Sequence, residues 1–138
     1  MTKGNIKMAK AKKNSPKRSL KSKIQRFIRG YADEDVWQMD YWFINIIPKM
    51  LRQLRDKGMG YPSKFKSKEE WHDELNKMIY YLEQSNPFDN KEENEYSTDK
   101  KFEPEKFLQK ELEIQKQKNE MKDKFFELFS KYFYELWD

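Results

Sequence analysis

Four polar residues fall at helical spacings beside apolar positions, and they are the first candidates for chemistry in this chain. Asp40 lies within the apolar stripe of a predicted helix over residues 33–57. His72, Asn76 and Glu83 follow one edge of a second predicted helix. A carboxylate inside an apolar stripe must be paired, because burying an isolated charge is costly. We therefore predict that these four residues form one structural polar cluster, in which the buried Asp40 is bonded to a cation or to His72.

Residues for enzyme chemistry are scarce in the sequence. The chain has one histidine and no cysteine, which leaves few nucleophile–base pairs and excludes thiolate metal sites. Glu69 and His72 have the spacing of half of a carboxylate di-metal site, but no second histidine completes it. The sequence contains no phosphate-binding loop, dinucleotide fingerprint, nucleophile elbow or zinc-protease motif. We predict a protein that is not an enzyme, without catalytic residues, metal or cofactor; catalysis by an Asp40–His72 pair is the minor alternative.

Basic residues are concentrated at the start of the chain. The first 30 positions hold eleven lysines and arginines and no acid, whereas the remainder holds 18 basic and 24 acidic residues. This asymmetry is typical of an interaction tail, although a solubilising tail has the same composition. Lysines contact phosphates without reading bases, and no aromatic residue precedes Phe27. We predict nucleic-acid association without sequence specificity, through Lys7, Lys10, Lys12, Lys13, Lys17, Arg18, Lys21, Lys23, Arg26 and Arg29.

The elements that must position these residues are all predicted to be helices. Apolar residues recur at helical spacing, and no alternating run with hairpin turn chemistry competes. The predicted fold is a small all-α bundle of about four helices with a long C-terminal helix. Its parts are a disordered basic arm (1–18), a helical core (19–85), a polar acidic loop (86–103) and a long C-terminal helix with an aromatic end (104–138).

Local signals predict the helix boundaries. A first helix over residues 20–29 ends at Gly30, and the acidic residues 33–35 begin a second. Pro48 predicts a kink in this second helix or its division into two abutting helices. Ser67 with Glu70 forms a capping box for a third helix, and Pro104 begins the last. The residues predicted to be buried in a compact core are Trp37, Phe43, Ile47, Trp71, Leu75, Ile79, Phe129 and Phe133.

The aromatic C-terminal segment is the second candidate for binding. Seven of thirteen residues from 125 to 137 are aromatic, which suits a core or a protein interface. The alternative function is therefore a protein-binding accessory or inhibitor that uses this segment or the acidic loop. The predicted contacts to a protein partner or a second copy are Phe125, Phe129, Tyr132, Phe133 and Trp137. No apolar run is long enough to span a membrane, and the N-terminus lacks the apolar region of a signal peptide.

One family resemblance lies in the middle of the chain. Residues 30–37 read GYADEDVW and are followed by Asp40, residues 60–62 read GYP, and residues 69–71 read EEW. This pattern resembles small bacteriophage-encoded proteins of unassigned function and covers about residues 30–83. The resemblance implies a phage source and a binding role, in the cytoplasm of a bacterial host or in the virion. It implies no catalytic residue.

Overall fold

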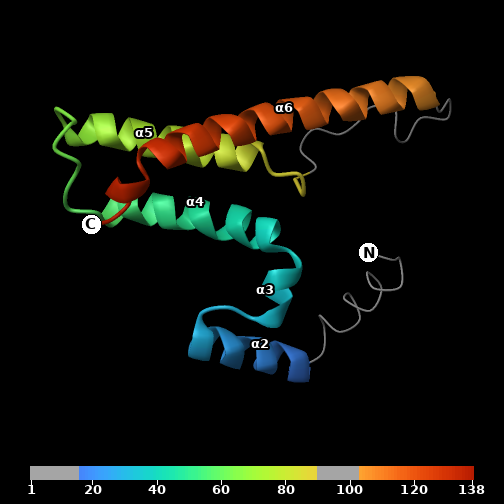
Figure 1. Cartoon of the computed structure of the whole chain (residues 1–138), viewed down its shortest axis with the longest axis horizontal. Helices are drawn as coiled ribbons and strands as arrows, with labels where there is room; N and C mark the ends of the chain where they lie inside the picture. Colours follow the sequence, from blue (N-terminus) through green and yellow to red (C-terminus); the bar gives the residue numbers. More distant parts are fainter. Residues whose placement is uncertain (1–15, 90–102) are drawn as a thin grey trace. The chain divides into compact units, whose positions relative to one another are not determined.

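In the computed structural model, the described residues are 16–89 and 103–138, and every regular element among them is helical (Figure 1). The all-α prediction and the long C-terminal helix are thereby confirmed. The chain divides into two compact units, residues 1–42 and 43–138. The elements are α2 (Pro16–Arg29), α3 (Asp33–Trp37), α4 (Met39–Lys57), α5 (Lys68–Gln84), α6 (Pro104–Lys131) and the 3₁₀ turn η1 (Phe133–Glu135).

In the first unit, α2 and α3 meet at a tight turn. Helix α2 begins at Pro16, earlier than the predicted start at residue 20. Proline suits a first helical turn because its missing N–H needs no partner there. The helix ends as predicted at Gly30, whose φ of 88° is a conformation that favours glycine. The Gly30 N–H donates to the Arg26 carbonyl oxygen over 2.9 Å and closes the last turn.

The helix predicted over residues 33–57 is broken at a different place. The break lies at Gln38, whose φ of −141° and ψ of 65° are not helical and which separates α3 from α4. The Gln38 carbonyl oxygen accepts a hydrogen bond from the Trp42 N–H over 3.0 Å, so it starts the next helix at once. Helix α4 then runs through Pro48, which is buried. Of the two outcomes predicted at Pro48, the division into two abutting helices was wrong.

The second unit is built around one face of α5, which lies alongside α6 (Figure 1). Helix α5 begins at Ser67 as predicted, and the Ser67 Oγ accepts from the Glu70 N–H over 3.3 Å. The Glu70 carboxylate, however, accepts from the Lys66 N–H instead of the Ser67 N–H that a capping box uses. The buried core cluster consists of Leu51, Trp71, Leu75, Met78, Ile79, Leu82, Phe125 and Tyr132.

Helix α6 begins at Pro104 as predicted but stops at Lys131, before the predicted end at residue 138. Beyond η1, the chain returns to the loop after α4, where the Asp138 Oδ1 accepts from the Met59 N–H over 2.8 Å. Midway along α6, the Lys118 ammonium donates to the carbonyl oxygens of Asn86 and Asp89, at 3.0 and 2.9 Å. Polar contacts therefore fasten both the middle and the end of this segment to the rest of the unit.

The predicted core is confirmed in its α5 part and wrong at its margins. Trp71, Leu75 and Ile79 are buried. Phe43, Ile47 and Phe129 are half-buried against the core cluster. Trp37 and Phe133 each expose about half of their surface, which contradicts their predicted burial. Trp37 lies at the end of the short α3, and Phe133 lies after α6 has ended, so neither continues the apolar face of a long helix.

Candidate functional site

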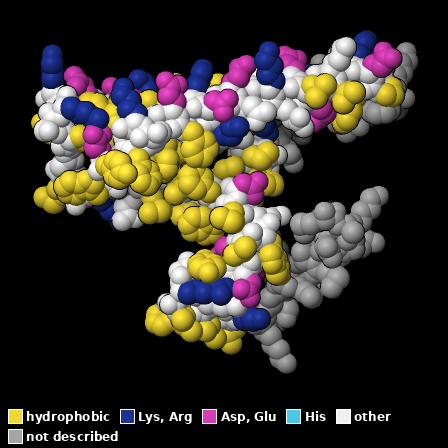
Figure 2. All heavy atoms as spheres, in the orientation of Figure 1, with side chains coloured by type: hydrophobic (Ala, Val, Ile, Leu, Met, Phe, Trp, Pro, Cys, Tyr) yellow, Lys and Arg dark blue, Asp and Glu magenta, His cyan; other side chains and the backbone are white. Residues whose placement is uncertain are grey.

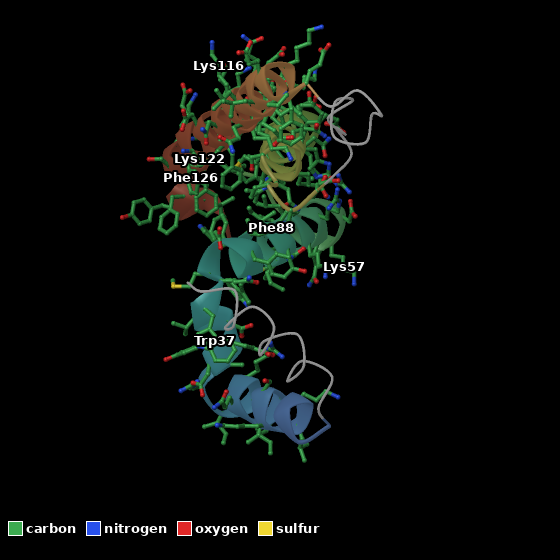
Figure 3. All side chains as sticks on the ribbon, turned by 90° about the vertical axis from the view of Figure 1, so that its right-hand side faces the viewer. Trp37, Lys57, Phe88, Lys116, Lys122 and Phe126 are labelled. Atoms are coloured by element: carbon green, nitrogen blue, oxygen red, sulfur yellow. The ribbon has the colours of Figure 1, made fainter. Side chains whose placement is uncertain are left out.

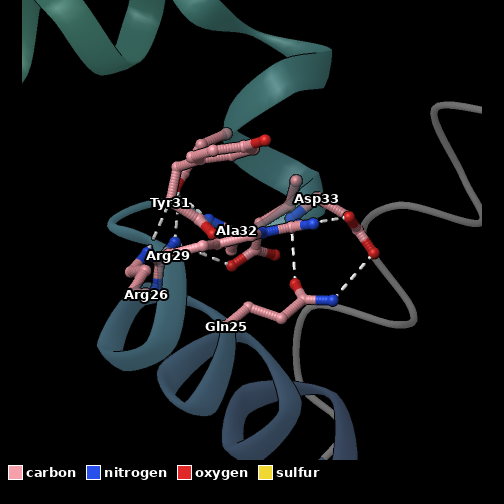
Figure 4. A network of polar contacts seen from close by, with 8 residues as sticks. Gln25, Arg26, Arg29, Tyr31, Ala32 and Asp33 are labelled. Atoms are coloured by element: carbon pink, nitrogen blue, oxygen red, sulfur yellow. Dashed lines mark hydrogen bonds and ion pairs between the residues drawn. The ribbon is translucent and has the colours of Figure 1, made fainter.

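A polar network holds the α2–α3 corner together (Figure 4). The Arg26 guanidinium donates to both carboxylate oxygens of Asp35, at 2.9 and 3.1 Å, and to Glu34 at 3.0 Å. Arg29 donates to the carboxylate of Asp33 and to the Tyr31 carbonyl oxygen. Two arginines predicted to contact nucleic acid are therefore occupied by carboxylates of their own chain.

The electrostatics of this corner follow from the same contacts. The hydrogen bond from Arg26 is the largest influence on the pKa of Asp35 and lowers it. Burial opposes this shift, and the Ala32 N–H and the charge of Arg26 lower the pKa further. The hydrogen bond from Arg29, followed by that from Gln25, lowers the pKa of Asp33. Both carboxyl groups are thus held as anions, and they neutralise the basic side of α2 that faces them.

Of the other predicted nucleic-acid contacts, the structure describes the side chains of two. Lys21 and Lys23 are exposed on α2. Lys17 and Arg18 belong to the same helix, but their side chains are outside the described part of the structure. Lys7, Lys10, Lys12 and Lys13 lie wholly outside the described residues.

The predicted polar cluster does not have the expected composition. Asp40 is exposed, so its predicted burial is wrong, and its carboxylate accepts a hydrogen bond from the Tyr41 N–H at 2.8 Å. The break at Gln38 explains this, because it places Asp40 in the first turn of α4 and interrupts the stripe on which its burial was predicted.

The other members of that cluster line a seam between α4 and α5. Arg52 donates to the Glu83 carboxylate at 2.6 Å, and Arg55 donates to the Asn76 side-chain oxygen at 2.7 Å. Arg55 also donates to the carboxylate of Asp56, and this hydrogen bond is the main cause that lowers the pKa of Asp56. The charge of Arg55 and then the charge of the half-buried His72 lower this pKa further. Two hydrogen-bonded side-chain pairs, Arg52–Glu83 and Arg55–Asn76, thus join α4 to α5 along this seam. Arg52 and Arg55, one helical turn apart, were the sequence signal for it.

The aromatic C-terminal segment is divided between core and surface. Phe125 and Tyr132 are buried in the core cluster, so the prediction that they contact a partner was wrong. Both lie on the side of the segment that faces α5, and they contact Phe43 and Trp71 through edge-to-face rings. The exposed aromatic side chains of the segment are Phe126, Phe133, Tyr134 and Trp137. Figure 3 shows Phe126 at the outer edge of this unit.

Of these side chains, Phe133 lines an apolar groove between α4 and the C-terminal segment. The groove has a volume of about 610 Å³ and is lined mainly by Ile47, Met50, Leu54, Phe129, Phe133 and Leu136. Lys57 and Asp138 provide charged groups on the same lining. Figure 2 shows the broad hydrophobic area over this part of the unit. Met50, which was not among the candidate site residues, is well exposed and contributes to this lining.

Comparison of the chain with protein-family models, curated proteins and solved structures gave no match. Within residues 16–89 and 103–138, no three histidine or acidic side chains lie together as a metal site requires. None of the helices in those two ranges has the length and apolar character needed to cross a bilayer.

Proposed function

We propose that this chain is a small non-enzymatic accessory protein that associates with nucleic acid through phosphate contacts, without sequence specificity. The observation that supports it is the set of eleven basic and no acidic residues in the first 30 positions. The resemblance of residues 30–83 to bacteriophage proteins supports a phage source and action in the host cytoplasm or in the virion.

The contacts at the α2–α3 corner refine the choice of binding residues. Because Arg26 and Arg29 are engaged by acidic residues, we assign phosphate binding to the lysines and to Arg18. Lysine provides a mobile point charge and no planar fork for base edges, which agrees with non-specific binding. If about six cations contact phosphates, a plot of the logarithm of the association constant for duplex against the logarithm of the salt concentration should have a slope near −5.

The test is fluorescence anisotropy with labelled duplex and single strand, for the full chain and for a variant that lacks residues 1–15. This truncation stops before Pro16, so α2 is retained. It removes five of the eleven cations, and we expect loss of most of the affinity and a smaller salt slope. Substituting both Lys21 and Lys23 by Gln should weaken binding similarly on unrelated sequences. Absence of binding at low salt, or binding unaffected by the truncation, would contradict the proposal.

A second candidate function is binding of a protein partner, and the apolar groove favours it. The groove and the exposed Phe133 on its lining fit an amphipathic helix, whose apolar side chains would fill it while charged ones meet Lys57 and Asp138. The test is capture of a partner from nuclease-treated host lysate, followed by rebinding of the purified partner. Replacing Met50 and Phe133 by Ser should abolish both steps. Met59→Ser, an exposed position outside the groove lining, is the matched control and should have no effect.

A further inference from the structure

Helix α2 turns its apolar side away from α3. Leu20, Ile24, Phe27 and Ile28 follow one stripe along the helix, and Phe27 and Ile28 are 91% and 75% exposed. Ser22, on the opposite side, is buried. Figure 2 shows hydrophobic side chains along the outer edge of this unit. This arrangement is the reverse of an ordinary surface helix, which buries its apolar stripe.

The reversal has a clear cause in the polar network. Arg26 and Gln25 bind the carboxylates of α3 and so hold the polar side of α2 inward (Figure 4). At 100° per residue, Lys21 and Lys23 lie at the two borders of the apolar stripe, and both are exposed. The nearest acids, residues 33–35, lie on the other side and are paired with arginines. The outward face therefore combines apolar side chains with cations and has no acid.

We propose that α2 is a membrane-surface helix, which inserts this apolar stripe into the interface of an anionic lipid layer. Lysines at both borders would then lie at the level of the headgroups, where anionic lipids attract them. A nucleic acid would contact the lysines but would leave the stripe in water. Since no described helix could cross a bilayer, this contact lies on the membrane and does not span it.

The experiment is flotation of the full chain with vesicles of phosphatidylcholine and with vesicles of an equimolar mixture with phosphatidylglycerol. We expect binding to the anionic vesicles and little to the neutral ones. Replacing both Phe27 and Ile28 by Ser should lower the vesicle affinity by on the order of tenfold or more, because two inserted side chains are lost. Tyr134→Ser, an equally exposed aromatic position in the other unit, is the matched control and should leave vesicle binding unchanged.

The same variants separate this inference from the proposed nucleic-acid binding. The Phe27/Ile28 variant retains every cation, so its affinity for labelled duplex should equal that of the unaltered chain. Circular dichroism verifies that the variant remains helical. Failure of the unaltered chain to bind anionic vesicles would overturn the inference. So would vesicle binding that depends on Lys21 and Lys23 but not on Phe27 and Ile28, because it would indicate adsorption by charge alone.

Discussion

The guanidinium of Arg26 and the carboxylate of Asp35 form a two-pronged ion pair between α2 and α3, with N–O distances of 2.9 and 3.1 Å. The same carboxylate accepts a hydrogen bond from the Ala32 N–H at 2.8 Å. Asp35 therefore anchors α2 and caps α3 at once. Because this pair fixes which side of α2 faces inward, it also determines that Leu20, Ile24, Phe27 and Ile28 face outward.

Replacing Arg26 by Gln should loosen this corner. We expect the free energy of opening this corner to fall by about 1 kcal/mol. This value is at the low end for a paired carboxylate because the Arg26 side chain is itself 43% exposed. Hydrogen exchange at the Ala32 amide should then accelerate by about fivefold. Lys23→Gln on the same helix removes a charge without a carboxylate bond and is the control. Equal exchange rates in both variants would show that the ion pair does not stabilise the corner.

The corner should also weaken in acid. The pKa of Asp35 is lowered from 3.8, mainly by the hydrogen bond from Arg26. A carboxyl group of this kind stabilises the folded state above its unfolded pKa, so its contribution is complete at neutral pH. It is lost as the pH falls from 3.8 through the lower folded-state value. NMR titration of the Asp35 carboxyl carbon measures that value, and in the Arg26→Gln variant it should move up towards 3.8.

Two adjacent phenylalanines should differ sharply in their contribution to stability. Phe125 is fully buried and contacts the rings of Phe43 and Phe129, so Phe125→Ala should cost about 3–5 kcal/mol. Phe126 is 44% exposed, and Phe126→Ala should cost about 1 kcal/mol. Urea unfolding of both variants measures the difference. Similar losses would mean that α6 is rotated about its axis relative to the packing described above.

The glycines after α4 provide a second matched pair. A Cβ at residue 58 would overlap the Leu54 carbonyl oxygen, which is backbone and accepts the Gly58 N–H. Gly58→Ala should therefore destabilise the second unit by about 1–3 kcal/mol. At Gly60, a Cβ would meet no atom within 4 Å, so Gly60→Ala should be neutral or stabilising by up to about 1 kcal/mol. Thermal unfolding followed by circular dichroism distinguishes the two, and a harmless Gly58→Ala would contradict the close approach.

Helix ends could be predicted from the sequence where one residue's local chemistry decides them. Gly30, Ser67 and Pro104 act within a turn of their own position, and the structure has each of them at the predicted terminus. The break at Gln38 has no such signal, because glutamine is a good helix former. The composition of residues 33–57 therefore favoured a single helix.

The orientation of helices was harder to predict than their existence. The first helix was predicted from the sequence, but the direction of its apolar stripe depends on the pairing of Arg26 with Asp35, nine positions away. Likewise, the edge of α5 was identified correctly, and its partners were misassigned to Asp40 instead of Arg52 and Arg55. Spacing places residues on a face; tertiary contacts decide what that face meets.

The late position of Phe125 and Tyr132 has a consequence for synthesis of the protein. Five of the eight core residues lie on α5, yet two of the others come from residue 125 onwards. While the chain is made from its N-terminus, α4 and α5 leave the ribosome with their shared apolar side uncovered. A nascent chain that stalls before residue 125 lacks two members of the core cluster, so we expect Trp71, Leu75 and Met78 to stay accessible to chaperones and proteases until that point is passed.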